Sequence, residues 1–307
     1  MKRKLINPFT DAAFKLLFGT EKNKVITIGF LNIILKPESR ITDVKFLNTE
    51  LIETPDAERT CRVDVLCETE DGTKLIVEMQ QGSQINFTNR LVYYGSRLID
   101  MQGQKGDWDY PLKKIHIISL MNFIYEIDNP VFRNDVLLTS RQTGKVFNNS
   151  LEFTLLQLPC LDHWNYSDLE TDDKKLVYLL KQMENSNMDH DTLFKMVDET
   201  KEGKELKEFY KKFLDIADYE SLSKEEKFKY DRALDNYNSL RCTYAYHLQQ
   251  GYEQGVKQGI EQGLNKGKAE GGRQQAIEVA RSMKQDSMPI EMIAKYTGLK
   301  IEEIELL

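Results

Sequence analysis

Two acidic residues, Asp64 and Glu78, lie on neighbouring predicted strands in the first half of the chain. Apolar and β-branched residues predict strands over 60–69 and 73–80, and both segments are apolar enough to be central in a sheet. A carboxylate on a central strand is unfavourable unless it is paired or binds a cation. Gln80 shares a face with Glu78, because side chains two residues apart in a strand point to the same side. The segment therefore offers oxygen ligands for a hard cation such as Mg²⁺ or Mn²⁺.

The length of the turn between these strands decides whether the two carboxylates meet. A two-residue turn would set Asp64 opposite Met79 and put Glu78 on the other face. A three-residue loop over 70–72, with Gly72 in the left-handed conformation, would set Asp64 opposite Glu78. We expect this second register, in which the two carboxylates repel unless a cation lies between them. The alternative is a hairpin whose acids lie on a solvated face.

Helices and strands alternate around this hairpin. Three segments repeat apolar residues with helical spacing: 9–18, 22–35 and 87–102. Five segments have strand patterns: 41–52, 60–69, 73–80, 113–121 and 151–158. The order of these elements predicts an α/β fold in which a mixed sheet is flanked by helices.

After Pro159 the pattern is helical throughout, which predicts an all-helical C-terminal extension. Amphipathic segments lie near 168–184, 190–198, 203–217 and 223–249. We therefore expect four parts: an α/β domain over 1–160, a helical extension over 161–250, a Gly-rich segment over 251–272 and a small helical tail over 273–307.

The Gly-rich segment repeats every four residues and has two interpretations. Seven of the chain's 17 glycines fall in it, and each lowers helix stability by roughly 0.8–1.0 kcal/mol relative to alanine, which favours a flexible linker. An apolar residue follows a glycine in successive repeats: Tyr252, Val256, Ile260 and Leu264. Such a stripe could pair with another helix and so form a homo-oligomer, because glycine lets helices approach closely. Both interpretations stay open.

Three blocks of the sequence together resemble the Rpn family. They are residues 7–19 (NPFTDAAFKLLFG), 64–80 (DVLCETEDGTKLIVEMQ) and 87–94 (FTNRLVYY). Rpn proteins are recombination-promoting nucleases, often described as transposases, within the PD-(D/E)XK nuclease superfamily. The resemblance implies a restriction-endonuclease-like core and a metal-dependent DNA endonuclease, with a link to recombination or mobile elements.

The resemblance also assigns expected roles to single residues. It implies that Asp64 and Glu78 bind Mg²⁺, with Mn²⁺ as a substitute. Gln80 stands where the superfamily usually has lysine, and Asp11 matches a position from which an additional acid often reaches the site. The alternative for Asp11 is a surface pair with Lys15, four residues on.

Glutamine at position 80 has a chemical consequence. Gln80 can orient a water molecule or bind a phosphate oxygen, but it cannot ionise and so cannot be a general base. A bound metal would have to generate the nucleophile. The residue therefore also favours a second hypothesis, a catalytically weak or inactive DNA- or protein-binding module that keeps the nuclease fold.

Basic residues on the expected helix over 87–102 are candidates for DNA contact. Arg90 and Arg97 lie close together on this helix with Tyr94, and basic groups beside an active face can position a phosphate backbone. The alternative is a solvated helix face with Tyr94 in the core.

Composition limits the class of protein. The net charge is −7, which argues against tight, non-specific coating of nucleic acid. The acidic excess follows residue 116: residues 1–116 hold 17 basic and 16 acidic residues, and the remainder holds 25 and 33. Four scattered cysteines without a CxxC pair predict a reduced, cytoplasmic protein. No apolar run has the length of a membrane span.

Overall fold

The computed structural model describes residues 3–51, 61–185, 188–199 and 202–307. Residue 52, at the end of one expected strand, and residue 60, at the start of another, lie outside the described residues. By its internal contacts the chain divides into two compact units, Met1–Tyr237 and Asn238–Leu307. No helix within the described ranges is long and apolar enough to cross a membrane.

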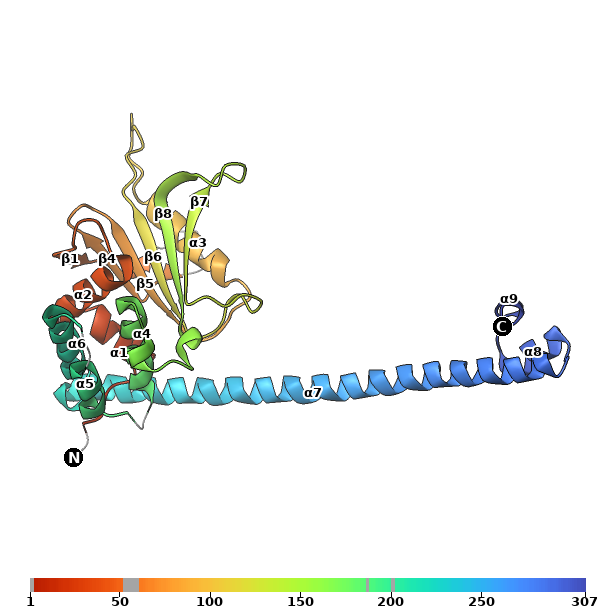
Figure 1. Cartoon of the computed structure of the whole chain (residues 1–307). Coiled ribbons are helices and arrows are strands. Elements are labelled where there is room, and N and C mark those ends of the chain that lie inside the picture. The colour runs from red at the N-terminus through yellow and green to blue at the C-terminus, as the bar shows by residue number, and fades with distance from the viewer. Residues whose placement is uncertain (1–2, 52–60, 186–187, 200–201) are drawn as a thin grey trace. The chain divides into compact units, whose positions relative to one another are not determined.

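Within the described part of the first unit, six strands form one mixed sheet in the order β1-β4-β5-β6-β8-β7 (Figure 1). The strands are β1 (Val44–Phe46), β4 (Val65–Thr69), β5 (Lys74–Gln80), β6 (Ile115–Met121), β7 (Arg133–Thr139) and β8 (Val146–Gln157). The central strands β5, β6 and β8 run parallel, whereas β1, β4 and β7 pair antiparallel. Two short strands, β2 (Glu50–Leu51) and β3 (Cys61–Arg62), pair separately.

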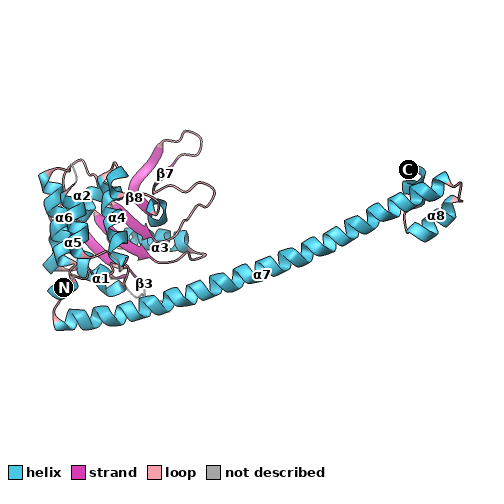
Figure 2. Ribbon diagram, turned by 60° about the horizontal axis from the view of Figure 1, so that its bottom comes forward, coloured by secondary structure: helices cyan, strands magenta, loops and turns pink. Residues whose placement is uncertain are grey.

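Helices cover both faces of the sheet, as the two views show (Figures 1 and 2). They are α1 (Asp11–Phe18), α2 (Lys24–Leu35), α3 (Phe87–Asp100), α4 (Asp172–Glu184), α5 (His190–Asp198) and α6 (Lys204–Ile216). Side chains alternate along β5, so that Ile76 packs in one apolar cluster with α3, while Leu75 and Val77 pack in another with α1 and α2. The expected α/β fold, with a mixed sheet between helices, is confirmed.

The helices α4–α6 belong to the same core as the sheet. Leu180 of α4 and Phe213 of α6 are fully buried in the apolar cluster that also holds Phe18 of α1. The rings of Phe18 and Phe213 lie 6.1 Å apart between centroids. The predicted division at residue 160 thus falls inside the first compact unit.

Two strand expectations differ from the structure. The strand β7 was not expected, because it is an edge strand with mostly exposed residues and no alternating pattern. The expected strand over 60–69 is interrupted at Val63 and Asp64, so that it forms β3 and then β4. The side chain of Asp64 takes a main-chain donor at this point, which interrupts the strand.

The helix α7 (Lys224–Gln285) begins in the first unit and continues into the second. It includes the whole Gly-rich segment over 251–272, which is helical in the structure. Two short helices follow, α8 (Ile290–Thr297) and α9 (Ile301–Glu305). Within the second unit, a small buried cluster packs α8 and α9 against the end of α7. It consists of Ala280, Ile293 and Ile304.

Candidate active site

The structure sets Asp64 opposite Glu78, as the sequence predicted. In the pairing of β4 with β5, Val65 lies opposite Val77, and the next pair outward is Asp64 with Glu78. The connecting loop has three residues, because the Thr69 N–H donates a hydrogen bond to the carbonyl of Thr73 at 3.0 Å. Gly72 in this loop has a φ of 86°, a left-handed conformation that glycine adopts without strain.

Each carboxylate accepts a hydrogen bond from a main-chain N–H of the facing segment. The Asp64 N–H donates to Glu78 Oε1 at 2.9 Å, and the Met79 N–H donates to Asp64 Oδ2 at 2.8 Å. A continued ladder would direct the Met79 N–H to the carbonyl of Val63. The Asp64 side chain takes that donor instead, which accounts for the bend between β3 and β4.

Burial makes this pair of carboxylates electrostatically unfavourable in the absence of a cation. Glu78 is only 3% exposed. Burial, together with the charge of Asp64, raises the pKa of Glu78 to about 8. Burial likewise raises the pKa of Asp64. The raised pKa of Glu78 favours its protonated form, so a cation bound between the two acids would compete with that proton.

Gln80 lies beside this pair and is tied to α3. Its Nε2 donates to Glu78 Oε2 at 3.1 Å, while its Oε1 accepts a hydrogen bond from Nη2 of Arg90. Arg90 also donates from Nη1 to Gln84 Oε1 at 2.7 Å. Its guanidinium carbon lies 5.9 Å from the centroid of the Tyr94 ring. Tyr94 itself is buried in the cluster under α3, as the alternative reading of this helix predicted.

The other two residues singled out in the sequence are farther from this arrangement. Asp11, at the start of α1, is exposed and pairs with Lys15 at 2.7 Å, so the surface pair is present. Its charge nevertheless raises the pKa of Asp64 and that of Lys15 lowers it, which shows that both lie within electrostatic reach of the site. Arg97 lies two turns beyond Arg90 on α3 and pairs with Asp100 at 3.5 Å.

The donor set fits a small, hard divalent cation. Over the ranges that the structure describes, no group of three or more His, Cys, Asp or Glu side chains is arranged to hold a metal ion. Mg²⁺ is commonly held by one or two carboxylates, with water and substrate phosphate as its other ligands. Asp64 and Glu78 supply such a set, and a cation between them would remove their mutual repulsion.

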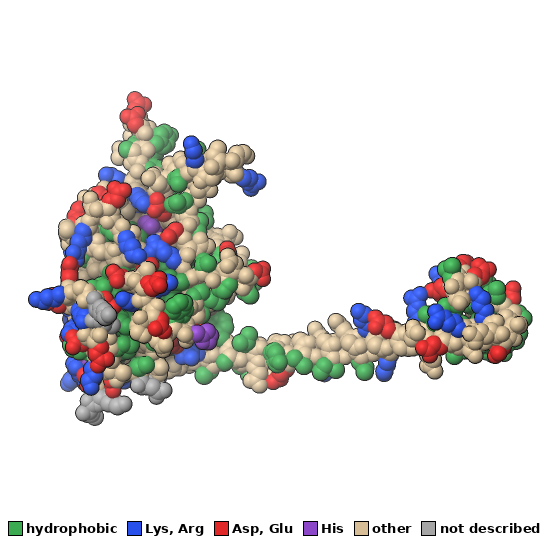
Figure 3. Space-filling view, viewed as in Figure 1, with side chains coloured by type: hydrophobic (Ala, Val, Ile, Leu, Met, Phe, Trp, Pro, Cys, Tyr) green, Lys and Arg blue, Asp and Glu red, His purple; other side chains and the backbone are tan. Residues whose placement is uncertain are grey.

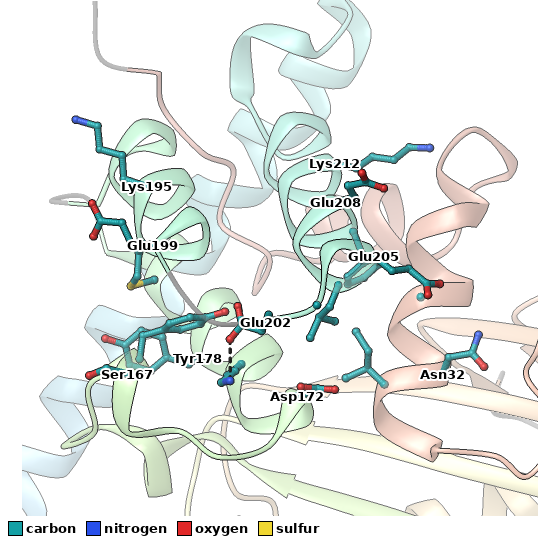
Figure 4. Close-up of a pocket in the computed structure, with 18 of the residues that line it drawn as sticks. Asn32, Ser167, Asp172, Tyr178, Lys195, Glu199, Glu202, Glu205, Glu208 and Lys212 are labelled. Atoms are coloured by element: carbon teal, nitrogen blue, oxygen red, sulfur yellow. Dashed lines mark ion pairs between the residues drawn. The ribbon is translucent and has the colours of Figure 1, made fainter.

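A separate cavity lies away from these residues. It has a volume of about 1640 Å³ and lies between α2, α4, α5 and α6 (Figure 4). The ion pair of Lys175 with Glu202, 2.7 Å long, lines it. None of the residues that the sequence singled out for catalysis or DNA contact lines this cavity.

One connection in the site was not predicted from the sequence. Arg90 was expected as a DNA contact, whereas the structure bonds it to Gln80. One sequence feature is consistent with this contact: Arg90 lies one turn into the helix that follows β5, the strand that ends at Gln80. Which of its faces meets the end of β5 depends on the loop between them.

Comparison with known proteins identifies a family. The model of the PD-(D/E)XK nuclease family transposases matches residues 8–241. Curated proteins and solved structures gave no match. The matched segment includes the sheet, both of its helical layers and the opposed carboxylates, and it covers more than half of the sequence. The chain therefore belongs to the PD-(D/E)XK nuclease family transposases.

Proposed function

We propose that the protein is a divalent-metal-dependent endonuclease that hydrolyses phosphodiester bonds in DNA. The observation that carries this proposal is the opposition of the half-buried Asp64 and the buried Glu78 on facing segments, where each carboxylate accepts a main-chain hydrogen bond from the segment opposite. A pair of carboxylates in this setting is favourable only when a proton or a cation neutralises it. Family membership supports the nuclease class, and the description as transposases supports a role in DNA recombination.

Each residue of the site has a separate task in this proposal. Asp64 and Glu78 hold Mg²⁺, with Mn²⁺ as a substitute. When bound, the ion supplies positive charge to the phosphate and activates a water molecule. Gln80 offers N–H groups to an anionic oxygen, since its own oxygen accepts from Arg90. Asp11 and Lys15 adjust the charge around Asp64 from α1, and Arg97 contacts the DNA backbone from α3.

Gln80 also supports the second candidate, a binding module without cleavage. The residue cannot take up a proton from water, so the chain has no general base at this position. In that case the opposed carboxylates would serve folding or metal-bridged binding alone. A cleavage assay separates the two candidates.

Supercoiled plasmid is the substrate for this assay. With Mg²⁺ the wild-type protein should produce nicked or linear DNA, and excess EDTA should abolish the reaction. Asp64→Asn should lower the rate at least about a hundredfold, because it removes a ligand charge while keeping the shape. The substitution also relieves repulsion with Glu78, so the variant should unfold at no lower temperature than the wild type.

Glu68→Gln is the matched control, because Glu68 lies in β4 four residues after Asp64 and thus roughly 13 Å away along the extended chain. It should cleave at the wild-type rate. Equal cleavage by wild type and Asp64→Asn would contradict the proposal, because the activity would then not depend on this site. A wild type that binds plasmid but never cuts it would favour the binding module.

Metal affinity should depend on pH. Because the pKa of Glu78 is raised to about 8 in the metal-free protein, a cation must displace a proton below that pH. The dissociation constant for Mn²⁺ should therefore fall by about tenfold per unit from pH 6 to pH 8 and level off above pH 8. Titration calorimetry in buffers of different ionisation enthalpy would measure both the affinity and the proton release. Affinity independent of pH over this range would contradict the assignment of Glu78 as a ligand.

The Gly-rich part of α7 is proposed to join two copies of the chain. Exposed apolar residues recur at four-residue intervals along α7, three before the Gly-rich segment and four within it: Leu240, Tyr244, Leu248, Tyr252, Val256, Ile260 and Leu264. Figure 3 shows hydrophobic side chains at intervals along this part of the helix. A helix with so many glycines is marginal by itself, so it needs packing partners for its stability.

Charge complementarity favours a second copy as that partner. Glu253 and Lys257 carry opposite charges one repeat apart. If two such helices cross antiparallel at Gly255, Glu253 of each copy lies opposite Lys257 of the other. Such a contact is self-complementary, as a twofold interface requires.

Light scattering after size-exclusion chromatography tests this association. The wild type should have at least twice the mass of one chain, whereas Ile260→Asp should dissociate it at the same concentration, because it buries a charge in the contact. Gln258→Asp places the same residue on the same helix outside the stripe and should keep the wild-type mass. A monomeric wild type, or an unchanged mass for Ile260→Asp, would rule out this contact.

A further inference from the structure

The side-chain amide of Gln80 can present either of two groups to the site, and its orientation decides which. An amide has an oxygen that accepts hydrogen bonds and a nitrogen that donates them, and the two are exchanged by a half-turn of the group. With the oxygen toward the carboxylates, Gln80 would meet the ionised, metal-binding form of Glu78 acceptor to acceptor, which is repulsive. With the nitrogen toward them, it donates.

Arg90 determines this orientation. A guanidinium only donates hydrogen bonds, and Nη2 of Arg90 contacts Oε1 of Gln80. The oxygen of the amide is therefore engaged on the side of α3, and its nitrogen lies 3.1 Å from Glu78 Oε2. Without Arg90, the amide oxygen would have no charged donor in this contact.

Arg90 is itself held in place by its surroundings. Its second terminal nitrogen donates to Gln84 at 2.7 Å, and its guanidinium lies over the ring of the buried Tyr94. Nε of Arg90 is buried and makes no hydrogen bond within the described part of the chain. A planar group fixed at two nitrogens and stacked near a ring keeps one direction, which a flexible surface arginine does not.

The charge of Arg90 acts through the amide as well. A positive charge on the oxygen side of an amide polarises it and makes its N–H groups stronger donors, because hydrogen bonds in series reinforce one another at low dielectric. Gln80 thus presents a polarised donor beside the carboxylates although it carries no charge of its own.

We propose that Arg90 is a positioning residue that works through Gln80: it holds the amide nitrogen toward the reaction site and polarises it for an anionic oxygen of the substrate. This inference rests on the proposed nuclease function and deepens it. It differs from a DNA contact, in which Arg90 would leave Gln80 and bind phosphate directly.

A double-substitution cycle distinguishes these roles. Arg90→Gln and Gln80→Leu should each lower kcat by about 10–100-fold, the range for residues that orient a site. If Arg90 acts only through Gln80, the double variant should lose no more than about twofold beyond Gln80→Leu alone, because the residue it orients is already gone. If the losses in kcat of the two single variants multiply in the double variant, the proposal is overturned.

Arg97→Gln is the matched comparison on the same helix. As a backbone contact, Arg97 should affect KM for DNA rather than kcat, and its loss should multiply with that of Gln80→Leu. Arg90→Gln should show the opposite pattern, a lower kcat with KM nearly unchanged. Arg90→Lys keeps a cation that can donate to Gln80 and should recover part of kcat. An increase in KM alone for Arg90→Gln would identify Arg90 as a DNA contact and overturn the proposal.

A measurement without DNA separates failure of this inference from failure of the nuclease function. In the metal-free protein, the side-chain NH₂ signals of Gln80 in a ¹⁵N–¹H spectrum, assigned with Gln80→Leu, should be shifted and protected from exchange. They should move toward free-amide values in Arg90→Gln and remain in place in Arg97→Gln. Unchanged Gln80 signals in Arg90→Gln would overturn the inference even if the protein cuts DNA. A shift in a protein that does not cut DNA would support the contact while defeating the nuclease function.

Discussion

The candidate site in the first compact unit depends on one unfavourable contact, the opposition of two carboxylates: the half-buried Asp64 just before β4 and the buried Glu78 of β5. Most buried strand positions in this sheet are apolar, and a pair of acids is tolerated there only because each accepts a main-chain hydrogen bond from the facing strand. The contact bends the chain between β3 and β4, and burial raises the pKa of both acids, with the charge of Asp64 adding to the shift at Glu78. Two carboxylate oxygens held this close together favour the binding of a hard cation, which would neutralise their charge.

The rest of the unit positions this contact. Gly72 in the turn fixes the register, and a shift by one residue would move Glu78 to the other face of the sheet. The sheet then presents the two carboxylates and Gln80 on the face that α3 covers, so that Arg90 reaches them from that side. The helix α1 packs on the opposite face, and its first turn brings Asp11 and Lys15 within electrostatic reach. Both helical layers thus contribute charge to the same strand ends.

Local rules predicted the parts of this arrangement that depend on neighbours in sequence. The alternation along two strands, with a three-residue loop that ends in Gly72, predicted that Asp64 lies opposite Glu78. The strand β7 was not predictable, because an exposed edge strand buries no apolar face and so has no alternating apolar pattern in the sequence. The bond of Arg90 to Gln80 was not predictable either, because it depends on the angle at which α3 leaves β5. For the Gly-rich segment, glycine content left helix and linker open, and the structure makes it helical; its association with a second copy stays a proposal.

Anomalous diffraction from crystals grown with Mn²⁺ tests the central claim most directly. The account predicts a manganese peak held by Asp64 and Glu78 together, and no peak at this position in Asp64→Asn crystals grown in the same way. A well-ordered site without manganese at saturating concentration would contradict it, and so would a peak bound by other residues and not by these two carboxylates.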